Sequence, residues 1–221
     1  RIYVATGAPC DFCTPDDSER GAILSFALDG SDRQLVASGL RQPADLAYDG
    51  ADLWVVDSVR EGLFDTPDLD EVNRVEAGAD YGFPNCVGAN MSDGADGTCN
   101  AVPPVIALPT GSTPLGIAAY RGDAIPSMQG KLLVVLNGSY NALELRGYLL
   151  VAADPQTGIY EEIMPARPDD SPGSNFTAEQ MNYRGSGFFP RRPLDVAVSD
   201  AGWVYISVSG GRILLMRPEN S

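Results

Sequence analysis

The chain has 221 residues, which suits one domain or part of a larger one, and its 44% of hydrophobic residues is enough for a buried core. Its 30 acidic residues outnumber the 15 basic ones and give a net charge of −15, which disfavours nucleic-acid and anionic-membrane partners. No histidine is present, so these residues cannot contain a Ser-His-Asp triad, a His-Glu-x-x-His zinc protease or a histidine-activated cysteine.

Short β-branched and aromatic runs, separated by Gly, Asp, Asn and Pro, predict an all-β chain. The 24 glycines and 17 prolines fit a fold with many turns. The best helical window, from Thr177 to Tyr183, is only about two turns long. In chain order, the expected strand-forming runs are 1–7, 21–30, 34–40, 43–47, 53–58, 71–75, 104–109, 114–118, 131–139, 147–152, 161–166, 193–197, 204–210 and 211–216.

A motif of Pro, any residue, Asp or Gly, an aliphatic residue and Ala recurs at 43–47, 114–118 and 193–197. Each copy follows a short apolar run and precedes two further strands. About four strands per unit is typical of a β-propeller blade. The motif recurs at intervals of more than 70 residues, beyond the roughly 40 to 45 of a minimal blade, so we expect long inserted loops, where binding sites usually lie.

Residues 1–7 resemble the third strand of such a unit, and 21–30 resemble the fourth. We therefore expect a single partial propeller domain of about three and a half four-stranded blades. A propeller must close its ring to cover its edge strands, so the sequence is expected to be part of a longer protein. The expected parts are a blade remnant at 1–30 and blades at about 31–80, 100–158 and 160–219.

Common cofactor and targeting motifs are missing from the sequence. Neither G-x-x-x-x-G-K-[ST] nor G-x-G-x-x-G occurs, which disfavours the common nucleotide-binding folds. Cys10 and Cys13 form C-x-x-C, but Thr14 follows them, so covalent attachment of a c-type haem is excluded. No apolar run reaches the roughly 18 residues of a spanning helix, and no signal-like segment follows Arg1, so we expect no membrane span.

The chain resembles the soluble glucose/sorbosone dehydrogenases, six-bladed propellers that bind pyrroloquinoline quinone (PQQ). The resemblance rests on YVATGAPCDFC, SGLRQPADLAYDGADLWVVDS, DEVNRVEAGADYGFPN, TPLGIAAY, LLVVLNGSYN and RRPLDVAVSDAGWVYIS, in the family's order. It implies oxidation of a sugar, or a related alcohol or aldehyde, by hydride transfer to the quinone, with PQQ and Ca²⁺ as cofactors. The substrate would be a small sugar or alcohol; the electron acceptor is not identified by the sequence.

The resemblance assigns cofactor contacts to Arg41, Gln42, Ser139 and Arg192. Arg41 and Gln42 stand where the family has an Arg-Asn pair, so the asparagine is replaced. Arg192 matches an arginine that pairs with PQQ carboxylates, which guanidinium forks bind in bidentate fashion. Arg41 could instead be a surface arginine paired with an acid. Further departures from the family are Leu194, in place of a second arginine, and Gly111 and Ser112, where a histidine is usual.

The resemblance also implies a calcium site in the loop before Asp70. Backbone carbonyls of Gly62 and Leu63, with Asp70, are the candidate ligands, and Ca²⁺ prefers such oxygen donors. Asp70, Glu71 and Asn73 could instead be solvated residues at the end of a strand. The family's catalytic base is a histidine upstream of the matched region, so no catalytic residue is expected in this segment.

The four cysteines allow three pairings. Cys86 and Cys99 bracket a Gly- and Asp-rich loop that a disulfide would constrain, and Cys10 and Cys13 could form a tight local bridge. A Cys₄ zinc site would need C-x-x-C spacing in the second pair, and a redox C-x-x-C usually lies by a βαβ unit. We predict the disulfides Cys10–Cys13 and Cys86–Cys99, and therefore a periplasmic or extracellular location.

Two functions are consistent with these patterns. The leading hypothesis is a PQQ- and calcium-dependent dehydrogenase whose catalytic base lies outside this segment. The alternative is a non-catalytic secreted propeller used for binding or assembly, which the departures at Gln42, Leu194 and Gly111-Ser112 favour. In both cases the expected partner is a set of upstream blades, from the same chain or another, that covers apolar residues on the open faces. These residues are Ile2, Val4, Ile213 and Leu215.

Overall fold

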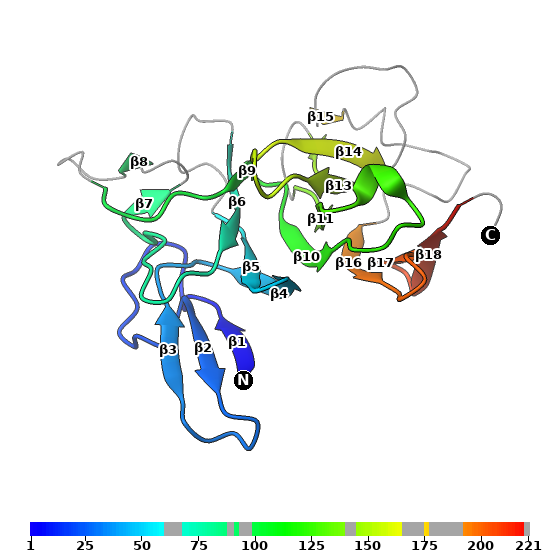
Figure 1. Cartoon of the computed structure of the whole chain (residues 1–221). Coiled ribbons are helices and arrows are strands. Elements are labelled where there is room, and N and C mark those ends of the chain that lie inside the picture. Colours follow the sequence, from blue (N-terminus) through cyan, green and yellow to red (C-terminus); the bar gives the residue numbers. More distant parts are fainter. Residues whose placement is uncertain are drawn as a thin grey trace.

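The computed structural model describes residues 1–59, 68–87, 91–92, 99–139, 145–164, 175–176 and 192–218. Four antiparallel sheets dominate these residues, and no α-helix occurs among them (Figure 1). The first sheet has the order β1 (Ile2–Thr6), β2 (Ala22–Phe26), β3 (Gln34–Ala37). The second has the order β4 (Pro43–Asp49), β5 (Asp52–Asp57), β6 (Asp68–Arg74), β9 (Ile106–Pro109).

The third and fourth sheets follow the same meander. The third has the order β10 (Pro114–Ala119), β11 (Leu132–Leu136), β13 (Leu149–Ala153), β14 (Tyr160–Met164). The fourth has the order β16 (Pro193–Val198), β17 (Val204–Val208), β18 (Arg212–Met216). The smaller elements are the pairs β7 (Cys86–Val87) with β8 (Met91–Ser92) and β12 (Leu145–Arg146) with β15 (Asn175–Phe176), and the 3₁₀ turn η1 (Pro126–Met128).

The four sheets stand side by side in chain order, as blades of a propeller do. Figure 1 shows the first sheet (blue) and the fourth (orange to red) on either side of the other two. The innermost strand of each of the last three sheets contacts its counterpart in the neighbouring sheet, β4 with β10 and β10 with β16. The prediction of an all-β, incomplete propeller is confirmed.

The hydrophobic core lies between the sheets. In β11, Leu132, Val134 and Leu136 face the second sheet, whereas Leu133 and Val135 face the fourth. Successive side chains of a strand point to opposite faces, so a strand between two neighbours is apolar at every position. All five side chains are fully buried, and each burial contributes roughly 1.5 to 3 kcal/mol. The continuous apolar run at 132–136 therefore places β11 inside the stack.

Strand pairing corrects the expected grouping of strands into units. The sequence-based units join each of the runs at 34–40, 104–109 and 161–166 to the Pro motif that follows. In the structure, β3, β9 and β14 instead pair with β2, β6 and β13, as the outermost strand of the preceding sheet. Reverse turns such as the one with a Gly30 N–H to Ala27 carbonyl bond fold the chain back onto the strand before it. The first and fourth sheets consequently have three described strands each.

The third residue of the repeated motif, Asp or Gly, lies at a β-bulge in the innermost strand of the second, third and fourth sheets. The Asp45 carboxylate accepts a hydrogen bond from the Ile117 backbone N–H, 2.9 Å away in the third sheet. A side chain at Gly116 would place its Cβ 2.7 Å from the Asp195 Cα in the fourth sheet. Aspartate therefore joins adjacent sheets, and glycine occurs where the backbones approach most closely.

The two outer faces of the stack expose apolar side chains. Ile2 and Val4 are exposed on the first sheet, and Ile213 and Leu215 on the fourth, as predicted. Among the described residues, no helix is both long and apolar enough to cross a membrane. The expected helical window, 177–183, lies outside the described residues.

Candidate functional site

All four predicted cofactor contacts lie at the same end of their sheets. Arg41 and Gln42 precede β4, Arg192 precedes β16, and Ser139 follows β11. In each sheet the start of the innermost strand pairs with the end of the second strand. The antiparallel meander therefore brings residues that precede the first strand beside residues that follow the second.

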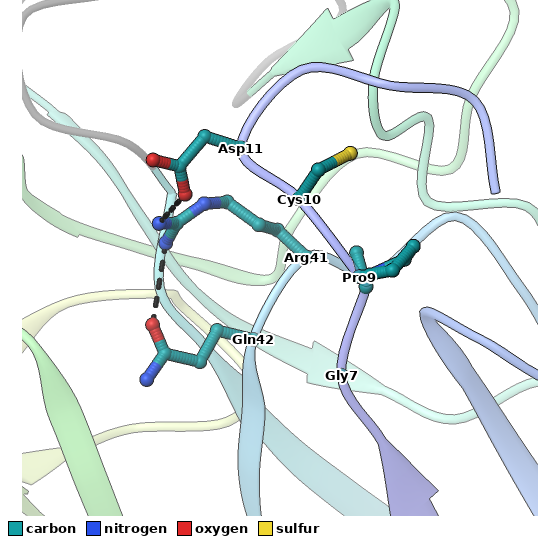
Figure 2. Close-up of a pocket in the computed structure, with 7 residues that line it drawn as sticks. Gly7, Pro9, Cys10, Asp11, Arg41 and Gln42 are labelled. Atoms are coloured by element: carbon teal, nitrogen blue, oxygen red, sulfur yellow. Dashed lines mark hydrogen bonds and ion pairs between the residues drawn. The ribbon is translucent and has the colours of Figure 1, made fainter.

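Arg41 and Gln42 line a pocket of about 340 Å³ beside the first disulfide loop (Figure 2). Arg41 Nη1 donates to the Ser58 carbonyl oxygen (2.9 Å) and to Gln42 Oε1 (3.3 Å), and Arg41 Nη2 donates to Asp11 Oδ1 (2.6 Å). Arg41 is thus paired with an acid, in agreement with the alternative interpretation, while its guanidinium also borders an open pocket. The pocket is lined by Gly7, Ala8, Pro9, Cys10, Asp11, Arg41 and Gln42.

Asp57, which the sequence analysis did not single out, orients this part of the site. Its buried carboxylate accepts hydrogen bonds from the backbone N–H groups of Arg41 (2.9 Å) and Gln42 (2.6 Å). Burial raises the pKa of Asp57 to about 6, although these hydrogen bonds oppose the shift. The sequence does carry a signal for Asp57, because this acidic residue ends the otherwise apolar run at 53–57. Buried carboxylates are rare unless they bind something.

Arg192 and Ser139, from adjacent sheets, come into direct contact. Arg192 Nη1 donates to the Gly138 carbonyl oxygen (2.6 Å), and Nη2 donates to that of Ser139 (2.9 Å). The Arg192 guanidinium carbon also lies 4.6 Å from the centre of the Tyr148 ring, in cation–π geometry. The Ser139 hydroxyl accepts from the Arg146 N–H, so Ser139 meets Arg192 through its backbone.

Gly138 is required by the geometry of this contact. Its φ of 102° lies in the region that side chains rarely adopt. A Cβ there would lie 2.3 Å from the Tyr148 ring. The glycine therefore lets the backbone pass close to the tyrosine ring.

Asp70 lies in the interior of the second sheet. Asp70 Oδ2 accepts from Ser112 Oγ (3.1 Å) and the Thr113 N–H (2.8 Å), and Oδ1 accepts from the Val59 N–H (3.0 Å). Asp70, Glu71 and Asn73 are all buried within β6, so the interpretation of solvated residues at a strand end is wrong. Burial raises the pKa of Asp70 to about 7, and the nearby Asp57 adds to the effect.

The surroundings of Asp70 suit an acceptor of hydrogen bonds better than a ligand of Ca²⁺. Three donors point their protons at its two oxygens and use three of the roughly four acceptor positions of a carboxylate, which leaves little of it for a cation. The described part of the chain contains no group of three acidic or cysteine side chains that could hold a metal ion. Gly62 and Leu63, the other predicted ligands, lie outside the described residues.

Both predicted disulfides, Cys10–Cys13 and Cys86–Cys99, are present. The first closes the loop that carries Asp11 to Arg41. The second joins residues 13 positions apart, next to the β7–β8 pair. The described residues contain no free cysteine, which excludes a thiolate metal site among them.

The stacked antiparallel sheets, with arginines at one shared end, define a β-propeller with a candidate anion-binding end. Residues 25–147, more than half of the chain, match the family model of Glucose / Sorbosone dehydrogenase. The chain belongs to this family, which confirms the resemblance found in the sequence.

Solved structures of sugar dehydrogenases share the fold. The holo PQQ domain of pyranose dehydrogenase from Coprinopsis cinerea matches with a TM-score of 0.72 and 18% identity, covering 98% of this chain and 66% of that one. The apo soluble aldose sugar dehydrogenase of Escherichia coli matches with a TM-score of 0.61 and 18% identity, covering 96% of this chain and 59% of that one. The PQQ-bound aldose sugar dehydrogenase of Streptomyces coelicolor matches with a TM-score of 0.58 and 19% identity, covering 97% of this chain and 57% of that one.

A curated relative is similar in sequence. An uncharacterized protein of Borreliella burgdorferi is 28% identical over 163 residues, which is 70% of this chain and 43% of that protein. The chain therefore spans less than half the length of its curated relative, and about two thirds or less of the solved structures described above.

Proposed function

We propose that this chain forms the cofactor-holding part of a PQQ-dependent dehydrogenase that oxidises a sugar or a related alcohol or aldehyde. The observation that carries the proposal is the placement of Arg41 and Arg192 at the same end of the second and fourth sheets, each before an innermost strand. The catalytic base would come from residues outside this segment. When bound, PQQ supplies the quinone that accepts the hydride.

The residues at this end fit an anionic, planar cofactor. PQQ carries three carboxylates, which guanidinium groups bind in bidentate fashion. Arg41 Nε is buried without an acceptor among the described residues, so Arg41 has hydrogen-bonding capacity beyond its present partners. Because the chain carries a net charge of −15, these arginines must offset a repulsive field before an anion can bind. Gln42 and Ser139 would add neutral polar contacts.

Calcium involvement stays a prediction for the backbone carbonyls of Gly62 and Leu63. Asp70 fits the ion poorly, because its oxygens already accept three hydrogen bonds. The proposal therefore assigns no step of the reaction to calcium.

We further propose that residues 1–221 form one partial propeller domain that requires upstream blades from the same chain or a partner. Neighbouring blades bury each other's apolar faces, and the exposed Ile2 and Ile213 lie on the two outer faces of the four described sheets. The two disulfides support a periplasmic or extracellular location, where such bonds persist.

The competing function is a non-catalytic propeller used for binding or assembly. It is favoured by the ion pair of Arg41 with Asp11, which already neutralises one of the two arginines, and by Leu194, whose half-exposed apolar side chain stands in place of the family's second arginine.

Titration of the full-length protein with PQQ in the presence of Ca²⁺, followed by a dye-reduction assay with aldoses, separates the two functions. Saturable binding and aldose-dependent reduction are expected. Failure to bind PQQ at micromolar concentrations would exclude the dehydrogenase proposal and leave the binding propeller.

A further inference from the structure

We infer that Asp70 is a positioning residue that orients the Arg192 guanidinium through two intervening turns of backbone. The two residues belong to the second and fourth sheets and are joined through the third. The consequence for cofactor binding rests on the proposed function, but the positioning itself does not.

The first step joins Asp70 to the turn before β10. Asp70 and Ser112 are completely buried, and the Asp70 carboxylate accepts from both the Ser112 hydroxyl and the Thr113 N–H. Thr113 has a φ of 53°, a left-handed conformation that β-branched residues rarely adopt and that costs roughly 1 to 3 kcal/mol. Such a conformation persists only where its surroundings impose it. The buried carboxylate supplies that constraint.

The second step joins this turn to the segment after β11. The carbonyl oxygen of Thr113 accepts from the Asn137 N–H (2.9 Å), and that of Ser112 accepts from the Gly138 N–H (2.8 Å). The orientation of the peptide groups at 112–113 therefore sets the orientation of the peptide groups at 137–138. A change in the first turn must move or break these two bonds.

The third step joins this segment to Arg192. The carbonyl oxygens of Gly138 and Ser139 accept from Arg192 Nη1 and Nη2, and the Asn137 side-chain amide donates to the Pro193 carbonyl oxygen (2.9 Å). The 137–139 segment thus donates its N–H groups to the turn on one side and accepts from the guanidinium with its carbonyl oxygens on the other. A continuous series of hydrogen bonds leads from Asp70 to Arg192, and most of its members are buried.

Asp45 offers a matched control. Its carboxylate also accepts from a backbone N–H of the third sheet, that of Ile117. Ile117 lies within β10, and this bond is not a member of the series from Asp70 to Arg192. Asp45→Asn therefore perturbs the contact between the same two sheets without touching the series of bonds.

Amide hydrogen exchange of the full-length protein tests the positioning without any ligand. Asp70→Asn is expected to speed exchange at Asn137 and Gly138 by about tenfold or more, because their acceptors lose their anchor. Asp45→Asn should leave both amides unchanged. Changes confined to Val59 and Thr113, or spread evenly over all sheets, would overturn the inference. If Asp70→Asn does not fold, Ser112→Ala removes one donor and should give a smaller change at the same amides.

A double-mutant cycle tests the consequence for PQQ. Asp70→Asn is expected to weaken PQQ binding by about tenfold to a hundredfold, as displaced positioning groups do. If Asp70 acts through Arg192, the double variant with Arg192→Ala should bind no more weakly than Arg192→Ala alone. Fully additive losses would overturn the inference. A wild-type protein that fails to bind PQQ would refute the proposed function, while the exchange measurement would still decide the positioning.

Discussion

Asp11 Oδ1 lies 2.6 Å from Arg41 Nη2, so a carboxylate of the chain itself occupies one side of an arginine expected to bind a carboxylate of the cofactor. The Asp11 side chain is 60% exposed, whereas that of Arg41 is 16% exposed. A pair with one partner in solvent contributes at most about 1 kcal/mol, so a ligand can displace it. The disulfide loop therefore provides Arg41 with a removable counter-ion.

Removing the Asp11 charge should tighten PQQ binding. Asp11→Asn leaves the pocket shape nearly unchanged and removes the competing anion, so an increase of about two- to fivefold in affinity is expected, within the range of an exposed ion pair. Fluorescence titration of the full-length protein measures this. Asp32→Asn breaks a similarly exposed pair with Arg1 outside the site and should have no effect. Weaker binding by Asp11→Asn would contradict the assignment of Asp11 as a competitor.

Acid should stabilise the chain between about pH 4 and pH 6. Burial raises the pKa of Asp57 from its ordinary value of 3.8 to about 6, so the folded state binds a proton that the unfolded state releases in this window. The free energy of unfolding therefore falls as pH rises through the window, by up to about 3 kcal/mol, since one pKa unit corresponds to about 1.4 kcal/mol.

Urea unfolding at several pH values, with Asp57→Asn as the variant, measures this contribution. The variant should show a shallower fall in stability between pH 4 and pH 6 than the wild type. Asp29→Asn is the control, because a hydrogen bond from the Ser31 hydroxyl lowers the pKa of the exposed Asp29, which then titrates below the window. An unchanged slope in Asp57→Asn would show that another group is responsible.

Gly116→Ala should destabilise the chain through the contact between the third and fourth sheets. Its Cβ would lie 2.7 Å from the Asp195 Cα, a backbone atom that cannot rotate away. Overpacking of this kind costs about 1 to 3 kcal/mol. Gly7→Ala, whose Cβ would lie 3.7 Å from the nearest atom, is the control in denaturant unfolding. Equal stabilities of the two variants would argue against the close approach of the sheets.

The two disulfides should differ in their contribution to stability. Cys86–Cys99 closes a loop with a sequence separation of 13, whereas the separation of Cys10–Cys13 is 3. By chain entropy, the longer loop is worth about 3 kcal/mol and the shorter about 2 kcal/mol. Two variants, each with both cysteines of one disulfide replaced by Ala, are compared by urea unfolding. The variant at Cys86 and Cys99 should lose more free energy of unfolding than the variant at Cys10 and Cys13. A larger loss at 10 and 13 would point to the contact of Asp11 with Arg41 instead.

Local patterns in the sequence were enough to predict the propeller class, the open apolar faces and the two disulfides. Continuous apolar runs such as 132–136 indicate strands buried on both faces, because side chains alternate along a strand. Cys86 and Cys99 bracket a loop that could readily bring them together. These features depend on residues close together in the chain, so they can be recognised without knowing the arrangement of the sheets.

The pairing of strands and the composition of the site depend on the tertiary structure. An apolar run such as 35–37 forms an equally good outer strand of either neighbouring sheet, and only the turn that folds it back onto β2 decides which sheet it joins. Arg41 meets Asp11 across 30 positions, Asp70 meets Thr113 across 43, and Arg192 meets Gly138 across 54. Residues so far apart carry no shared local pattern. Asp70 therefore looks like a metal ligand in the sequence, and only the packing of the second sheet against the third surrounds it with hydrogen-bond donors.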